Sequence, residues 1–156
     1  MTFNESDHKA MRLAIEASAE ALADGDMPFG ATLVSAQGEI LLVAANNQNS
    51  AADCTGHAEM VLVRTAQKQL GLRALRGATV YASGEPCAMC SGAMFWAEIR
   101  RVVYAASTEQ IGTALGGPQL PARSAEVLAN TSPAMTVEGS LMADEACAVL
   151  AQFVPD

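Results

Sequence analysis

The sequence lacks a long hydrophobic run. Its longest uninterrupted apolar stretch extends from Ile40 to Ala45, whereas a membrane-spanning helix needs about 20 such residues. The N-terminal stretch MTFNESDHKAMR also lacks the basic-then-apolar order of a secretion signal. We therefore expect a cytoplasmic protein that does not contact a membrane.

Positive charge and cysteine are also scarce. Nine Lys and Arg residues stand against seventeen Asp and Glu residues, which gives a formal net charge of −8. A surface of this sign grips a polyanionic backbone poorly, so we expect a small-molecule ligand and no nucleic acid partner. In a reducing compartment the four cysteines do not indicate a disulfide framework, and metal binding or catalysis explains them better.

Apolar residues, by contrast, suffice for one domain. The chain has 156 residues, of which 51% are hydrophobic, and this favours a single domain over 1–156. The order of periodic segments predicts an α/β fold, with a sheet that is covered by helices on both faces and mixed because it opens with a hairpin. Between residues 107 and 133 the signal is weak, and GGPQLP suggests a loop. The expected elements are a helix at 7–25, a hairpin at 30–46, a helix at 56–71, a strand at 78–83, a helix at 86–99, strands at 100–107 and 133–141, and a helix at 142–153.

One Cys-x-x-Cys motif occurs, at Cys87 and Cys90. Such a pair alone is compatible with a redox couple, a structural zinc clamp or a catalytic zinc, and zinc would need at least one more protein ligand. The chain has two histidines. His8 lies near the start of the first expected helix, where a solvent-facing role is expected. His57 opens a helix and is followed two residues later by Glu59.

These residues can form one site. Cys87 and Cys90, at positions i and i+3, share a helix face and can chelate one ion. His57 and Glu59, at i and i+2, can serve the same site only if their helix points its N-terminal end at it. His-x-Glu followed by Pro-Cys-x-x-Cys is the signature of zinc nucleobase deaminases, in which the Glu is a general acid and base and not a ligand. The motif predicts one catalytic zinc per chain, held by His57, Cys87 and Cys90 with a fourth position open.

Two other interpretations of the cysteines remain open. A redox pair would leave His57 and Glu59 unexplained. A closed site, with Cys54 as a fourth ligand, would make the protein a non-catalytic binding module stabilised by structural zinc. Glu59 argues against this second interpretation, because a closed site has no water to activate. Otherwise we expect Cys54 and Cys147 to be small buried hydrophobic residues.

Five segments carry a resemblance to a known family. In order and spacing they make the chain similar, over nearly its whole length, to the cytidine and deoxycytidylate deaminase superfamily, and most similar to its bacterial guanine deaminase and tRNA adenosine deaminase branch. This resemblance implies a three-layer α-β-α sandwich with a five-stranded mixed sheet, one catalytic zinc per subunit, and a homodimer or larger assembly. The segments are MPFGATLV (27–34), NNQN (46–49), GHAEM (56–60), SGEPCAMCSGAMFWAEIRRVVYAAS (83–107) and VEGSLMADEACAVLAQF (137–153).

The resemblance also implies substrate contacts. Phe29 and Trp96 are similar to aromatic residues of guanine deaminases and imply a pocket closed around a bare ring. Asn46 matches the asparagine that hydrogen-bonds a ring carbonyl or nitrogen. The backbone N–H of Ala58, at a helix start, is a candidate to stabilise developing charge. The carboxylate with which guanine deaminases hold the far edge of guanine has no counterpart, because the segment after the YAA strand offers only Glu109, which comes too early.

The resulting hypothesis is a zinc-dependent hydrolytic deaminase. Its substrate would be an aminated free nucleobase or a related heterocycle, such as guanine or isocytosine, which is converted to the oxo product and ammonia. The first alternative is a tRNA-specific adenosine deaminase that converts adenosine to inosine. The second, from another functional class, is the non-catalytic module with structural zinc.

Overall fold

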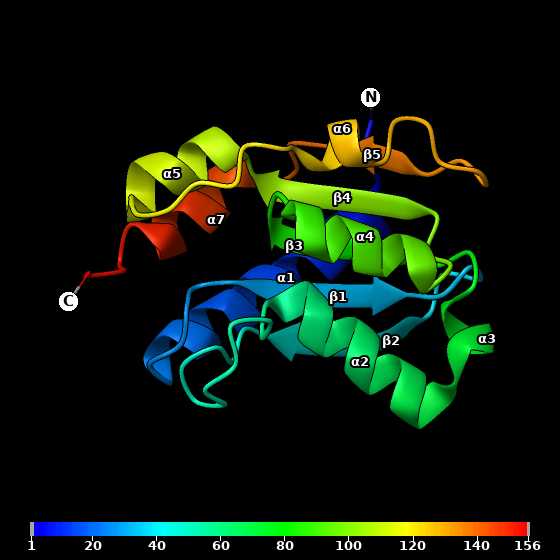
Figure 1. Cartoon of the computed structure of the whole chain (residues 1–156), viewed down its shortest axis with the longest axis horizontal. Coiled ribbons are helices and arrows are strands. Elements are labelled where there is room, and N and C mark those ends of the chain that lie inside the picture. Colours follow the sequence, from blue (N-terminus) through cyan, green and yellow to red (C-terminus); the bar gives the residue numbers. More distant parts are fainter. Residues whose placement is uncertain (1, 156) are drawn as a thin grey trace.

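A five-stranded mixed sheet forms the centre of the computed structural model, which describes residues 2–155 (Figure 1). The strand order is β2-β1-β3-β4-β5. β1 pairs antiparallel with both β2 and β3, whereas β3, β4 and β5 pair in parallel. The expected mixed α/β sheet is thereby confirmed. The strands are β1 (Gly30–Val34), β2 (Ile40–Ala45), β3 (Thr79–Gly84), β4 (Arg101–Ala106) and β5 (Thr136–Glu138).

Helices cover both faces of this sheet. α1 packs against β1, β2 and β3, and α7 packs against β4 and α1. α2 packs against β2 and β1, and α4 contacts α2, so these two helices lie in front of the sheet in Figure 1. No helix in residues 2–155 has the length and apolar character needed to cross a membrane. The helices are α1 (Glu5–Ala23), α2 (Ala58–Leu70), α3 (Leu72–Leu75), α4 (Ala88–Trp96), α5 (Thr108–Leu115), α6 (Ser124–Val127) and α7 (Ala143–Leu150).

The core is divided by the sheet into two parts. Along β3, Val80 contributes to the cluster beneath α2 and α4, whereas Tyr81 belongs to the cluster beneath α1 and α7. Along β4, Val102 and Val103 divide in the same way. This alternation follows from the two-residue period of a strand, and it explains why the middle of each strand has apolar side chains on both faces.

The strand directions bring several loops to one edge of the sheet. Because β2 and β3 both run antiparallel to β1, they run parallel to each other, and β4 follows the same direction. The carboxyl ends of β2, β3 and β4 therefore meet at the edge where β1 begins. In open α/β sheets, ligands bind outside the carboxyl ends of the strands.

The segment between residues 107 and 133 differs from the sequence expectation. It contains α5 and α6 rather than a loop alone. α5 starts with a capping box, in which the Gln110 N–H donates to Ser107 Oγ (3.2 Å) and the Ser107 N–H donates to Gln110 Oε1 (2.9 Å). The Ser-x-x-Gln pattern at 107–110 is the sequence signal for the start of this helix. The last strand is shorter than expected, and α4 begins at Ala88 with Cys87 as its N-cap, so Pro86 lies outside the helix.

A polar network joins α1 to the sheet at the opposite edge. Asp7 Oδ1 accepts from the Tyr81 hydroxyl (2.6 Å) and from Arg101 Nη1 (3.0 Å), and Arg101 Nη2 donates to Glu138 Oε2 (2.8 Å). Burial by itself would raise the pKa of Asp7, but hydrogen bonds from Tyr81, the Asn4 N–H and Arg101 lower it overall. Asp7 is therefore held in its charged form, and the network links α1, β3, β4 and β5.

We predict that Arg101→Leu lowers the free energy of unfolding by roughly 1–3 kcal/mol, because it leaves the buried Asp7 carboxylate without its cation. Arg76→Leu is the matched control, since it removes the exposed ion pair with Glu98 (3.1 Å) and should cost about 1 kcal/mol or less. Because the folded-state pKa of Asp7 is lowered, the Arg101 effect should shrink as the pH falls through that pKa. Urea denaturation provides the measurement, and equal losses in the two variants would contradict the assignment.

Candidate metal centre and pocket

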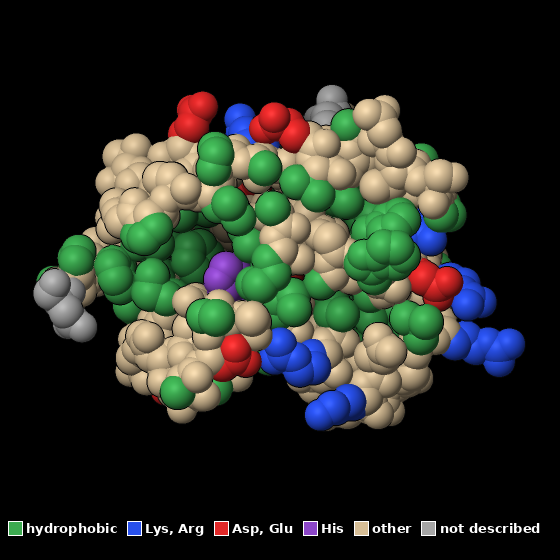
Figure 2. All heavy atoms as spheres, viewed as in Figure 1, with side chains coloured by type: hydrophobic (Ala, Val, Ile, Leu, Met, Phe, Trp, Pro, Cys, Tyr) green, Lys and Arg blue, Asp and Glu red, His purple; other side chains and the backbone are tan. Residues whose placement is uncertain are grey.

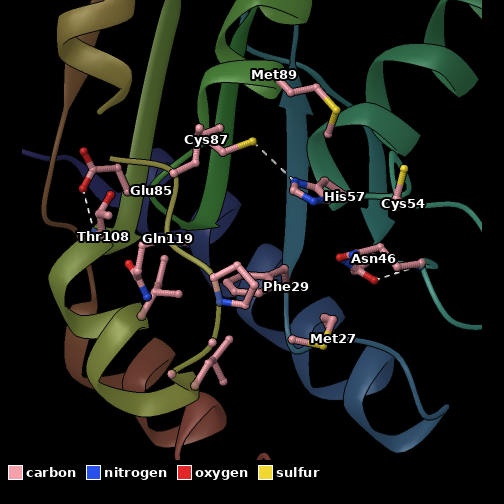
Figure 3. Close-up of a pocket in the computed structure, with 18 of the residues that line it drawn as sticks. Met27, Phe29, Asn46, Cys54, His57, Glu85, Cys87, Met89, Thr108 and Gln119 are labelled. Carbon is pink, nitrogen blue, oxygen red and sulfur yellow. Dashed lines mark hydrogen bonds between the residues drawn. The ribbon is translucent and has the colours of Figure 1, made fainter. Parts of the chain in front are cut away.

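Three metal-ligating side chains converge at the carboxyl edge of the sheet. His57 ends the loop that follows β2 and is the N-cap of α2, and Cys87 follows β3 and is the N-cap of α4. Cys90 lies in the first turn of α4 and is buried. The His57 Nδ1 atom lies 3.5 Å from each sulfur, and the two sulfurs lie 3.7 Å apart. Figure 3 shows Cys87 and His57 pointing toward each other.

These distances fit one zinc ion. With Zn–S near 2.3 Å and Zn–N near 2.0–2.1 Å, a tetrahedral ion separates two sulfurs by about 3.8 Å and a sulfur from a nitrogen by about 3.6 Å. The three ligand atoms all lie within 4.8 Å of one another, and no fourth Cys, His, Asp or Glu of residues 2–155 joins them. The cluster thus provides three ligands and leaves one tetrahedral position for water or substrate.

The pKa values of the two thiols favour binding of a cation. The hydrogen bond between the two sulfurs and the nearby His57 lower the pKa of Cys87 to about 4, although burial opposes this effect. The same hydrogen bond, together with burial, raises the pKa of Cys90. The two sulfurs therefore share one proton, whose place a divalent cation can take when it binds both as thiolates.

Glu59 is the second residue of α2 and is buried, with 6% of its surface exposed. Burial raises the pKa of its carboxyl to about 7, because the charged form is poorly solvated. A bound cation would oppose this shift. Glu59 lines the same pocket as His57 and Cys87 but is not part of the ligand cluster. It therefore lies beside the metal cluster without being one of its ligands.

A cavity of about 720 Å³ opens beside the metal cluster. Figure 2 shows a hollow on this face of the molecule, lined largely by hydrophobic side chains, with a histidine at its edge. The metal cluster lies on one side, and α5, the loop after it and the segment after α7 form other parts of the wall. The lining residues are Met27, Phe29, Asn46, Gln48, Cys54, His57, Glu59, Gly84, Glu85, Cys87, Met89, Thr108, Ile111, Leu115, Gly116, Gly117, Pro118, Gln119, Leu120, Ala122, Phe153 and Pro155. This size is typical of small-molecule sites.

Two of the residues expected to contact substrate line this cavity. Phe29 lies just before β1, and its ring packs so close to Gly84 that a Cβ there would lie 2.7 Å from it. Asn46 follows β2 and is buried. Its Oδ1 accepts from the Gln48 N–H (2.9 Å) and its Nδ2 donates to Gln48 Oε1 (2.6 Å), which fixes the amide. Ala58 is buried at the first position of α2, where its backbone N–H belongs to the helix terminus.

Trp96 does not line the cavity, so the prediction that its ring closes the substrate pocket is wrong. Its side chain is 78% exposed, and its ring packs edge-to-face on Phe95 with centroids 5.0 Å apart. The reason is the helical phase. Trp96 comes six residues after Cys90, and at about 100° per residue this places it about 240° around α4 from Cys90 and roughly one and two-thirds turns farther along the helix.

Cys54 is also placed differently from the expectation. It is exposed and lines the cavity rather than being buried, while Cys147 is partly buried. Cys54 does not belong to the ligand cluster, so the closed four-ligand site is not formed in the described part of the chain.

Glu85 was not anticipated from the sequence, although it stands two residues before Cys87. Its Oε1 accepts from the Thr108 N–H (2.8 Å) and from Arg123 Nη2 (2.8 Å), and its Oε2 accepts from Arg123 Nε (3.0 Å). Burial would raise the pKa of Glu85, but Arg123 and Thr108 lower it overall. Glu85 thus ties the start of α5 and the start of α6 to the strand that leads into the metal cluster.

Comparison with known proteins extends these observations. Residues 4–106 match the sequence model of the cytidine and deoxycytidylate deaminase zinc-binding region. The chain is 37% identical over 147 residues to the "Probable cytosine deaminase" of Schizosaccharomyces pombe, covering 92% of this chain and 89% of that protein. It is 37% identical to a tRNA-specific adenosine deaminase of Haemophilus influenzae, covering 70% and 63%. The solved guanine deaminase from Nitrosomonas europaea shares the fold, with a TM-score of 0.79, 22% identity, and 96% and 84% coverage.

We predict that replacing His57, Cys87 or Cys90 with Ala abolishes stoichiometric zinc binding and lowers the thermal midpoint, because the metal binds only the folded chain. Cys54→Ala is the matched control and should keep one zinc per chain. Elemental analysis of the purified variants measures this, and loss of zinc from the control would instead support a closed four-ligand site.

Proposed function

The chain belongs to the cytidine and deoxycytidylate deaminase family, and from this premise we propose that it is a zinc-dependent hydrolytic deaminase of free nucleobases. Water replaces the amino group of a small heterocycle such as guanine or isocytosine, and the products are ammonia and the oxo compound. The observation that carries the proposal is the buried Glu59 in the same cavity as the His57 and Cys87 ligands. The homodimer and the cytoplasmic location stay predictions.

Each group of the site has a separate role in the proposed reaction. When bound by His57, Cys87 and Cys90, zinc supplies a hydroxide nucleophile by lowering the pKa of water to around 7. Glu59 accepts the proton that water loses and delivers it to the ring nitrogen beside the amino-bearing carbon. The same carboxyl then carries a proton to the departing amine, so that ammonia leaves. The backbone N–H of Ala58 stabilises charge that develops near the start of α2.

The cavity wall orients the ring. Asn46 Nδ2 has two N–H groups: one donates to Gln48 Oε1, and the other donates to a ring carbonyl or nitrogen. Phe29 packs against the ring face, since an aromatic wall buries a flat heterocycle well. These contacts would hold the amino-bearing carbon beside Glu59 and the cluster of His57, Cys87 and Cys90.

The charge of the cavity favours a free base over RNA. No Lys or Arg occurs among its lining residues within 2–155, and the whole chain carries a net charge of −8. Affinity for RNA depends on cations that contact phosphates. A tRNA adenosine deaminase is the second candidate, and the Haemophilus influenzae relative is the observation that favours it.

A substrate panel tests the proposal. We expect the zinc-loaded protein to release ammonia from at least one of guanine, isocytosine and cytosine, and to leave adenosine in a tRNA anticodon stem-loop unchanged at equal concentrations. A coupled ammonia assay and sequencing for inosine provide the two readouts. Conversion of adenosine to inosine without ammonia from any free base would establish the RNA-editing alternative instead.

We predict that Glu59→Gln keeps about one zinc per chain while turnover falls at least ~10²-fold, the lower end of general acid-base contributions. Gln preserves the shape of the side chain but cannot accept the proton. Zinc content and ammonia release are measured on the same preparation. Near wild-type turnover would rule out the assigned role, and zinc loss would make Glu59 a metal ligand.

A further inference from the structure

The cavity has few groups that can meet the far edge of a ring. Its acidic lining residues within 2–155 are Glu59, which serves the metal end, and Glu85. Both oxygens of Glu85 are occupied, because Arg123 donates to each of them and the Thr108 N–H donates to one. The side chain of Gln119, in the loop after α5, is a polar lining group on this wall.

Gln119 is exposed on the cavity wall, and its amide lies against α5. Its amide makes no hydrogen bond to another side chain or backbone group of residues 2–155, but it lies flat against the bare backbone of Gly112. A Cβ at position 112 would lie 3.0 Å from Gln119 Nε2 and 3.1 Å from Oε1. Because glycine has no side chain, the Gln119 amide can lie where the side chain of another residue would crowd it. In Figure 3, Gln119 and Asn46 lie on opposite sides of Phe29.

The loop that carries Gln119 is linked through Arg123 to Glu85, which stands two residues before the ligand Cys87. It turns at Gly116 and Gly117, which have φ values of 65° and 77°. It ends at Arg123, whose guanidinium forms the two-pronged ion pair with Glu85. Glu85 also accepts from the Thr108 N–H at the start of α5, so one buried carboxylate anchors the segment that carries Gln119 on both sides.

We propose that Gln119 is a specificity-determining residue that reads the polar ring edge on the side away from Asn46. A primary amide offers an N–H donor and a C=O acceptor side by side, so it pairs with a ring N–H next to a ring carbonyl. A carboxylate at this position would only accept. The substrate class that fits is an uncharged amino-oxo ring with an unsubstituted lactam edge. This inference rests on the proposed function.

The test compares two substitutions at Gln119 with the free base that the wild type deaminates fastest. Gln119→Leu removes donor and acceptor and should lower kcat/KM roughly 10- to 100-fold, mainly through KM, because the ring edge is buried without partners. Gln119→Glu has almost the same shape but turns an acceptor toward the ring carbonyl, and it should lower kcat/KM at least as much. Zinc content and thermal midpoint should not change in either variant.

Glycine variants test the packing that places the amide. Gly112→Ala places a Cβ 3.0 Å from Gln119 Nε2, which shifts the amide slightly, and it should lower kcat/KM in the same direction as Gln119→Leu, though less. Gly92→Ala in α4 is the matched control, because a Cβ there meets nothing within 4 Å, and its kinetics should equal those of the wild type. An equal effect of the two changes would show that the packing on Gly112 is irrelevant.

A binding measurement separates recognition from chemistry. In the Glu59→Gln background, calorimetry should show weaker binding of the product base, uracil or xanthine, after Gln119→Leu. Unchanged affinity and kinetics in Gln119→Leu would overturn the inference, and so would activity of Gln119→Glu at or above the wild-type level. Either result leaves the deaminase proposal intact, whereas that proposal fails if the wild type releases no ammonia from any base.

Discussion

The convergence of two helix N-termini on one point is the constraint on which the site depends. β2 and β3 run in the same direction on either side of β1, so the chain enters α2 and α4 at one edge of the sheet. His57 and Cys87 are the N-caps of these helices. Their first-turn N–H groups favour negative charge and hence thiolates, which is the form that zinc binds. A buried carboxyl at Glu59 completes the arrangement without entering it as a ligand.

The same edge also organises the outer wall of the cavity. Glu85 follows β3 directly and binds both the start of α5 and Arg123 before α6. The segment from α5 to α6 is thereby attached to the end of β3, which leads into the ligands Cys87 and Cys90. Because the ion pair is bidentate and Glu85 is buried, its geometry is more strictly defined than that of a surface pair.

The order of elements, the mixed sheet and the metal motif could be predicted because each depends on neighbours in sequence. Spacing within His-x-Glu and Cys-x-x-Cys already determines which side chains can share a site. Trp96 and Cys54 were misplaced because an apolar run does not reveal which side of a helix or loop faces a cavity. Glu85 and Gln119 could not be found in the same way. Glu85 pairs with Arg123, which is 38 residues away in sequence. Gln119 packs on Gly112, and no sequence motif indicates that contact.

The central claim is that the chain holds a catalytic zinc with an open position. X-ray absorption at the zinc edge of the metal-loaded protein tests it most directly, because it counts the ligand atoms by type. The account predicts two sulfurs at about 2.3 Å and two nitrogen or oxygen atoms at about 2.0–2.2 Å, one from His57 and one from solvent. A shell of three sulfurs and one nitrogen, which would require Cys54 as a fourth ligand, would contradict it.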